Sequence, residues 1–289
     1  MELPLVVGVD GSEPSLRALD WAVDDTARRG VPLRVLYASG WEWHKGHEPS
    51  FGVHRGKARV YSDHIVAQAV ERALRRTAAV QVSGEALAED PAAALVRESR
   101  TACAVVVGSR GRGELAGLLL GSVGLSVAAH AEGPVVVVRG DADHRAAVFG
   151  QVAVGVGGPD QATAAVALAF EAAERRGAVL RAVHAWRCPD REVPDLPRAA
   201  DATDGHQWRA EMQLDEVLRA PMRAHPTVTV RREVVEGRVR TALLNVTTAS
   251  DLVVLGARRS TGHVGLQLGP FNHALLHHAA CPVAVVPHD

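Results

Sequence analysis

Short apolar runs alternate along the whole chain with segments of helix-like apolar spacing. In the first half, the runs that we expect to form strands are Leu3–Val9, Leu33–Ala38, Val80–Ala86, Cys103–Gly108 and Pro134–Val138. The segments between them, which we expect to be helices, are Glu13–Arg29, Lys57–Thr77, Pro91–Arg100 and Gly121–His130. Strands that alternate with helices predict a parallel sheet covered by helices on both faces.

The second half repeats this order of strands and helices. Its expected strands are Gln151–Val156, Ala178–Ala185, Val228–Val234, Asp251–Gly256 and Pro282–Val286. Aligned pairs lie 147 or 148 residues apart: Val9 with Val156, Ala38 with Ala185, Gly108 with Gly256, Gly121 with Gly269 and Pro134 with Pro282. The repeat predicts two tandem domains, 1–141 and 147–289, joined through the polar segment Gly140–Gly150. We expect each to be a Rossmann-like α/β domain with an open, parallel, five-stranded sheet.

A glycine-rich segment follows the fourth expected strand. Residues Gly108 to Ser122 read GSRGRGELAGLLLGS, with the spacing G-x2-G-x9-G-S, and lead into a helix. Glycines let backbone N–H groups approach phosphates, and a helix N-terminus favours anions, so this segment is a candidate phosphate cradle. Ligands of open α/β sheets bind where the strand order switches. If strands 1 and 4 flank that switch, Asp10 at the end of strand 1 belongs to the same site.

The second copy of this segment, GARRSTGHVGLQLGP from Gly256 to Pro270, departs from the pattern. The substitutions are Gly157 for Asp10, Pro159 for Ser12, Arg259 for Gly111, Pro270 for Ser122 and Phe271 for Val123. Gly157 removes a carboxylate, Pro270 removes a hydroxyl and an N–H donor, and we expect the phenyl ring of Phe271 to crowd the pocket. We therefore expect the second fold to be kept and its site to be weakened or lost. Phosphate binding by the charges of Arg258 and Arg259 stays open as an alternative.

Composition narrows the classes of function. A formal net charge of -1 over 289 residues argues against binding to nucleic acid. The three cysteines, Cys103, Cys188 and Cys281, form no CxxC pair, which fits a reducing cytoplasm. The chain begins without a signal-peptide pattern, and no apolar run approaches the roughly 20 residues that span a bilayer, so we expect no membrane association.

The tandem repeat, V-D-G-S at the end of strand 1 and G-x2-G-x9-G-S after strand 4 resemble the universal stress protein family, in its tandem ATP-binding branch. The resemblance covers about Leu3 to Pro287. It implies that Asp10 lies near the nucleotide and its Mg²⁺, and that the backbone of Ala38 meets adenine. The positions that it implies for phosphate and ribose are Gly108, Gly111, Gly121 and Ser122, followed by Val123.

The resemblance implies a cytoplasmic stress-response module that binds ATP in its N-terminal domain, pairs its two domains through their last strands and forms a homodimer. The motif regions hold no nucleophile–base pair or carboxylate dyad, so we expect no enzyme, although slow ATP hydrolysis stays open. The alternatives are an adenine-nucleotide-hydrolysing enzyme of the same superfamily and a nucleotide-free dimeric scaffold. The protein target, the stress signal and the choice among ATP, AMP and a cyclic nucleotide are left open.

The loop after strand 2 offers two weaker signals. His44-Lys45-Gly46-His47 matches H-x-G-H, but that motif should open the first helix of a nucleotidyltransferase, so we interpret the match as accidental. Together with Glu48 and His54 these histidines make a weak metal pattern on no expected helix face. Trp41 and Trp186 occupy nearly equivalent places in the two halves, which favours a packing role.

Overall fold

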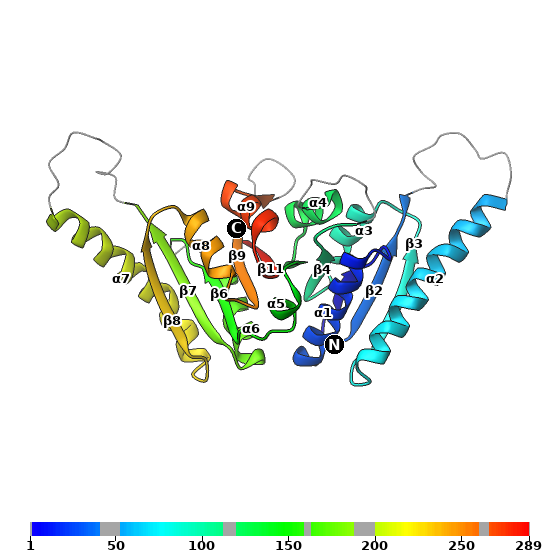
Figure 1. The fold of residues 1–289 in the computed structure, drawn as a ribbon, viewed down its shortest axis with the longest axis horizontal. Coiled ribbons are helices and arrows are strands. Elements are labelled where there is room, and N and C mark those ends of the chain that lie inside the picture. Colours follow the sequence, from blue (N-terminus) through cyan, green and yellow to red (C-terminus); the bar gives the residue numbers. More distant parts are fainter. Residues whose placement is uncertain are drawn as a thin grey trace. The chain divides into compact units, whose positions relative to one another are not determined.

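The computed structural model describes residues 2–40, 53–111, 120–158, 163–187, 200–259 and 266–288. The chain divides into two compact units, Met1–Arg139 with Ser260–Leu266 and Gly140–Arg259 with Gln267–Asp289. Each unit is an α/β structure of parallel strands and helices (Figure 1), as the alternating pattern predicts. No helix in the described ranges combines the length and the apolar character that crossing a membrane requires.

In the first unit, parallel strands pair in the order β3-β2-β1-β4-β5. Their bounds are β1 Leu5–Gly8, β2 Leu33–Ala38, β3 Val82–Leu87, β4 Ala104–Gly108 and β5 Val135–Val138. The order reverses between β1 and β4, which pair directly with Leu5 opposite Ala104. This confirms the expectation that strands 1 and 4 flank the switch. The carboxyl ends of both strands, at Gly8 and Gly108, therefore lie at one edge of the sheet.

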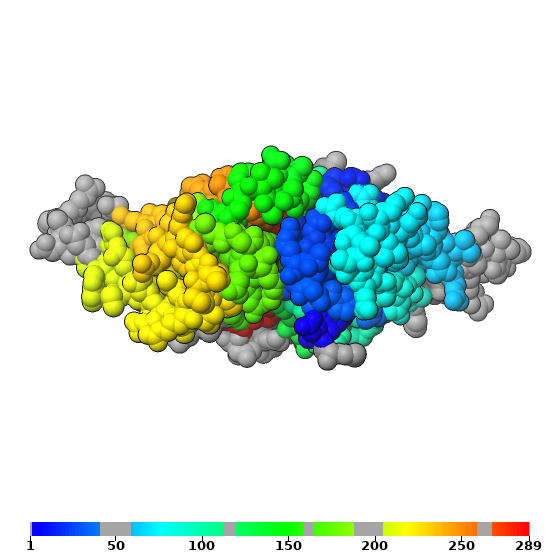
Figure 2. All heavy atoms as spheres, turned by 90° about the horizontal axis from the view of Figure 1, so that it is seen from below, coloured from blue at the N-terminus to red at the C-terminus, as the bar shows by residue number. Residues whose placement is uncertain are grey.

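The helices of this unit are α1 Glu13–Arg29, α2 Val53–Arg76, α3 Pro91–Glu98 and α4 Ser122–His130. Helix α1 packs beside α2, and α3 packs beside α4 (Figure 1). Because parallel crossovers are right-handed, the reversal of strand order sends these two pairs to opposite faces of the sheet. Figure 2 shows the surface of the first pair, with α1 in blue beside α2 in cyan. The sheet lies between the two pairs of helices, and its apolar side chains, such as Leu5 and Val7, are buried.

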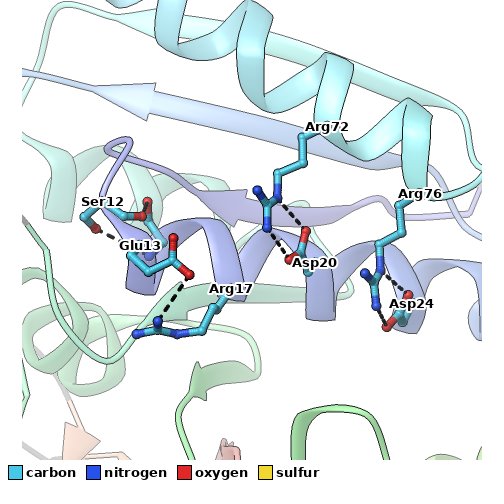
Figure 3. A network of polar contacts seen from close by, with 8 residues as sticks. Ser12, Glu13, Arg17, Asp20, Asp24, Arg72 and Arg76 are labelled. Carbon is cyan, nitrogen blue, oxygen red and sulfur yellow. Dashed lines mark hydrogen bonds and ion pairs between the residues drawn. The ribbon is translucent and has the colours of Figure 1, made fainter. Parts of the chain in front are cut away.

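Local sequence sets where α1 begins and ends, and ion pairs join it to α2. Ser12 caps its first turn and Gly30, with φ 72°, ends it. Two arginines of α2 each donate two hydrogen bonds to one aspartate of α1 (Figure 3). The pairs are Arg72 with Asp20, both bonds 2.7 Å, and Arg76 with Asp24, at 2.6 and 2.7 Å. These pairs hold the two helices in one register.

The second unit repeats the design, with parallel strands in the order β8-β7-β6-β9-β11 and β10 beside β9. The strands are β6 Gln151–Gly155, β7 Val179–Trp186, β8 Val230–Glu236, β9 Leu252–Arg259, β10 Leu266–Gln267 and β11 Val283–His288. The helices are α5 Ala142–Arg145, α6 Thr163–Arg176, α7 Ala200–Ala224, α8 Val239–Thr247 and α9 Pro270–His278. Phe170 of α6 is the largest side chain that is fully buried among the described residues.

The segment Gly140–Gly150, expected from its composition to be a polar junction, holds the short helix α5 and a buried histidine. His144 is 6% exposed, and its Nδ1 lies 2.6 Å from Oδ1 of Asp141. The segment ends on the carboxylate of Asp251, itself 2% exposed, which accepts the backbone N–H groups of Phe149 and Gln151, both at 3.0 Å. The junction is therefore an ordered part of the second unit.

Candidate functional site

The turn after β1 fixes the carboxylate of Asp10. Its Oδ1 accepts hydrogen bonds from the backbone N–H of Ser12 at 2.9 Å and from the hydroxyl of Ser12 at 2.6 Å. Gly11 between them has φ 80°, a conformation that glycine adopts without a Cβ penalty. The backbone N–H of Asp10 donates to Oγ of Ser15 at 3.2 Å. The sequence D-G-S-E-P-S thus closes on itself and holds an anionic group at the carboxyl end of β1.

The backbone after β4 passes close to this turn. A Cβ built on Gly111 would lie 2.6 Å from Oδ2 of Asp10, so a side chain at position 111 would displace the carboxylate. A Cβ on Gly108 would lie 2.7 Å from the backbone oxygen of Pro14 in α1, so glycine here permits close packing of β4 on α1. Glycine at position 108 is therefore required for the packing of β4 on α1, whereas glycine at position 111 leaves room for the carboxylate of Asp10.

Gly121 forms the N-cap of α4. Its φ and ψ are -72° and 155°, and its N–H donates to the backbone oxygen of Ser109 at 2.9 Å. Within the described residues, no side chain caps this helix. Its first-turn N–H groups are therefore left for an acceptor from outside, and the helix dipole adds partial positive charge there. This is an anion-binding arrangement at the switch point of the sheet.

These elements line a pocket of about 310 Å³. Every residue that the family resemblance implies for the nucleotide lies on its wall: Asp10, Ala38, Gly108, Gly111, Gly121, Ser122 and Val123. Their roles toward a ligand stay predictions. Residues 112–119, the middle of the motif, lie outside the described residues.

Apolar side chains make one part of this pocket and charged groups another. The apolar part comprises Leu36, Val107, and Pro91 and Leu95 from α3. Arg110, exposed on the wall, adds a cation. Apolar positions in α3 also suit a core helix, so the sequence pattern alone does not place α3 at this site. The strand order, which brings α3 beside β1, supplies that information. The pocket suits a ligand with one flat apolar part and one anionic part.

A second pocket, of about 460 Å³, lies at the equivalent strand ends of the second unit. Gly155, Ala185, Leu243, Gly256 and Gly269 line it at positions that align with Gly8, Ala38, Leu95, Gly108 and Gly121. Phe271 lies on its wall, and the cavity is larger than that of the first unit. Arg258 also lines it, whereas the side chain of Arg259 lies outside the described residues.

Two polar residues of this pocket escaped the sequence analysis. Asn272, which aligns with Gly124, is 1% exposed, and His184, which aligns with Tyr37, is 8% exposed. Within a single sequence, an asparagine on a helix and a histidine in a strand give no signal of a site. The aligned repeat would have marked Asn272, because it stands where the first copy has glycine.

No cluster of three or more His, Cys, Asp or Glu residues that could hold a metal ion occurs in the described ranges. Among the described residues that line the first pocket, Asp10 is the one carboxylate, so a cation there would take further ligands, such as oxygens of a bound molecule. The histidine pattern of His44, His47 and His54, with Glu48, lies outside the described side chains, as does the H-x-G-H match.

Two tryptophans and two cysteines that the sequence analysis named remain to be placed. Trp186, half-buried, stacks on His206 with ring centroids 6.1 Å apart, in line with the packing role expected for it, while Trp41 lies outside the described residues. Cys281 is buried. Cys103 is half-buried, and burial raises the pKa of its thiol, which disfavours the reactive thiolate.

Comparison with known proteins assigns the family. The family model described as the universal stress protein family matches twice, at residues 3–139 and 149–287. The universal stress protein Rv2005c of Mycobacterium tuberculosis is 37% identical over 289 residues, covering 97% of this chain and 96% of the relative. A crystal structure of a universal stress protein from Archaeoglobus fulgidus matches with a TM-score of 0.72 at 18% identity, covering 99% of this chain and 98% of that one. A universal stress protein solved in complex with cAMP is 31% identical, with a TM-score of 0.37, and covers 48% of this chain and 97% of its own. The chain belongs to the universal stress protein family.

Proposed function

We propose that the first unit binds ATP with Mg²⁺, and that the chain works as a nucleotide-dependent module of the stress response. The observation that supports this most is the convergence on one pocket of a carboxylate from β1, a glycine-rich backbone from β4 and the uncapped start of α4. These groups come from segments about 100 residues apart and meet at the switch point, where α/β folds place their ligands.

The apolar part of the pocket would take the base. Leu36, Pro91 and Leu95 offer a surface for an adenine ring, and the backbone of Ala38 at the end of β2 would meet its edge. The phosphates would face Gly121, Ser122 and the N–H groups of the first turn of α4, with Arg110 as a flanking cation.

Asp10 fits Mg²⁺ better than it fits phosphate alone. Its carboxylate lies beside Gly111 of the cradle, where it would repel bare phosphate oxygens. A divalent cation would supply neutralising charge between the carboxylate and the phosphates. Residues Ser12 and Ser15 keep the carboxylate in place through the closed turn after β1.

The proposed role is binding and sensing. Two other candidates from the sequence are separable by product analysis: an adenine-nucleotide-hydrolysing enzyme would release AMP and pyrophosphate from ATP, and a scaffold would carry no nucleotide. A homodimer in the cytoplasm, with paired domains, remains the proposed setting on the strength of family membership.

Isothermal titration of ATP with Mg²⁺ into the full chain tests the proposal, together with mass spectrometry of nucleotide that heat releases from freshly purified protein. We expect about one ATP per chain. Two equivalent ATP sites would contradict the restriction to the first unit, and no ATP in either experiment would contradict the function itself.

A further inference from the structure

The pocket of the second unit keeps its apolar walls and loses the anion-binding groups of the first. Val183 and Leu255 replace Leu36 and Val107, and Ala185 and Leu243 keep the types found in the first unit. At the other end, Gly157 stands in place of Asp10, and Pro270 stands in place of Ser122. Proline at the first position of α9 offers neither a hydroxyl nor an N–H to an anion. The second pocket therefore loses a carboxylate, a hydroxyl and an N–H donor that the first pocket offers.

Asn272, on the wall of this pocket, carries an unsatisfied acceptor beneath the surface. Its Nδ2 donates to the backbone oxygen of Gly256 at 3.1 Å. A carbonyl oxygen only accepts, so this contact fixes which end of the amide faces Gly256. The other end, Oδ1, is buried and has no hydrogen-bond partner within the described part of the chain. The aligned residue of the first unit, Gly124, has no such group.

His184 is the second polar residue that lines this pocket. Its Nδ1 lies 3.0 Å from the backbone oxygen of Val156, which accepts only, so Nδ1 carries the proton. The pocket thus combines apolar walls with one unsatisfied acceptor, Oδ1 of Asn272, and a ligand that donates hydrogen bonds suits it better than one that only accepts.

From this we propose that the pocket of the second unit binds an uncharged purine nucleoside, represented by adenosine, rather than a nucleoside triphosphate. Ribose hydroxyls and the exocyclic amine of adenine donate hydrogen bonds, whereas the ionised oxygens of a triphosphate only accept and would oppose Oδ1 of Asn272. The assignment of the apolar end to the base rests on the proposed function of the first unit. Arg258, an exposed cation on the wall, is the group that could still bind a phosphate. The experiment below distinguishes binding of a nucleoside from binding of a nucleoside triphosphate.

Isothermal titration of adenosine into the full chain, already saturated with ATP and Mg²⁺, tests the proposal. Saturation blocks the first pocket, so we expect one adenosine per chain beyond the bound ATP. Asn272→Gly, which installs the residue of the first unit, should weaken adenosine binding about five- to tenfold and leave ATP binding unchanged. The reciprocal variant Gly124→Asn should weaken ATP binding and leave adenosine binding unchanged. Circular dichroism and thermal unfolding of both variants check that the fold is retained.

The outcomes separate this proposal from that of the first unit. One ATP without any further adenosine overturns the nucleoside site and leaves the proposed function standing. Binding of two ATP molecules per chain would overturn the claim that the second pocket excludes a triphosphate, whether or not adenosine displaces the second ATP. Adenosine binding that Asn272→Gly does not change overturns the role of its amide oxygen. Adenosine binding without any ATP binding contradicts the proposed function of the first unit alone.

Discussion

Replacing Gly121 by aspartate separates loss of ATP binding from loss of fold. Gly121 is the N-cap of α4 with an extended backbone, φ -72° and ψ 155°, and aspartate is among the residues that helix N-caps prefer. A Cβ there would meet its nearest neighbour, Cα of Arg110, at 3.6 Å, an ordinary contact. Aspartate is a better N-cap than glycine by a few tenths of a kcal/mol, so the free energy of unfolding should stay the same or rise slightly.

The same carboxylate would oppose the phosphates of ATP. A Cβ on Gly121 would lie 3.7 Å from the backbone nitrogen of Gly111, which places the side chain over the cradle. Two unit charges about 4 Å apart repel by about 1 kcal/mol in water and about 4 kcal/mol at an effective dielectric constant of 20. Because 1.4 kcal/mol changes a dissociation constant tenfold, ATP affinity should fall by between about fivefold and about a thousandfold.

Isothermal titration of ATP with Mg²⁺, paired with thermal unfolding, measures both effects in one sample. Gly269→Asp is the matched control, because Gly269 is the N-cap of α9 and a Cβ there would lie 3.6 Å from the ring of Phe271. We expect it to leave ATP affinity unchanged. If Gly121→Asp bound ATP as tightly as the wild type does, the reasoning about the start of α4 would be wrong. Gly108 is a poorer choice, since its Cβ would meet the backbone of Pro14 and add strain to the loss of binding.

Three further predictions concern the scaffold. Asp251→Ala leaves two backbone N–H groups of the junction without their acceptor and should lower the free energy of unfolding in urea by about 2–4 kcal/mol; a loss below half a kcal/mol would contradict this. The hydrogen bond from His225 is the largest cause that lowers the pKa of Glu174, so this ionised carboxylate stabilises the fold above its unfolded-state pKa, and the contribution is lost as pH falls through the lower folded value. Melting temperatures of Glu174→Gln should accordingly fall less than those of the wild type as the solution is acidified below about pH 4.5, and parallel curves would refute the assignment. Arg76→Ala removes the half-exposed pair with Asp24 and should cost about 0.5–1 kcal/mol at low salt and less at high salt, in denaturant titrations at two salt concentrations.

The sequence predicted the parts of the fold that local chemistry determines. Glu13–Arg29 forms a helix with the expected bounds because Ser12 caps it and Gly30 ends it in the left-handed conformation. Leu33–Ala38 is a strand with the expected bounds because it is a compact apolar run that follows Pro32. Periodicity and capping residues act over a few positions, so one sequence suffices to read them.

The parts that the sequence did not predict depend on contacts between distant residues. The helix α5 is only four residues long, and the carboxylate that fixes the end of its segment comes from Asp251, about 100 positions further on. The same holds for the two pockets. Neither the contribution of α3 to the first pocket nor that of Asn272 to the second can be predicted until the strand order is known. The motif placed Asp10 and Gly111 in one site because both directly follow strands that the fold makes neighbours.

Loss of a single group accounts for several differences between the two copies. In the first unit, Oδ1 of Asp10 is held by Ser12, and Oδ2 stands where a Cβ on Gly111 would come within 2.6 Å. The serine, which also caps α1, thus holds the carboxylate, and the glycine leaves room for it. Once glycine replaces that aspartate, as at Gly157, a hydroxyl at the serine position has no carboxylate to hold, and a side chain at the glycine position has none to displace. The second copy indeed has Pro159 and Arg259 there. Asp10, Ser12 and Gly111 therefore form one physical unit, and restoring the aspartate alone at Gly157 should not rebuild an ATP site.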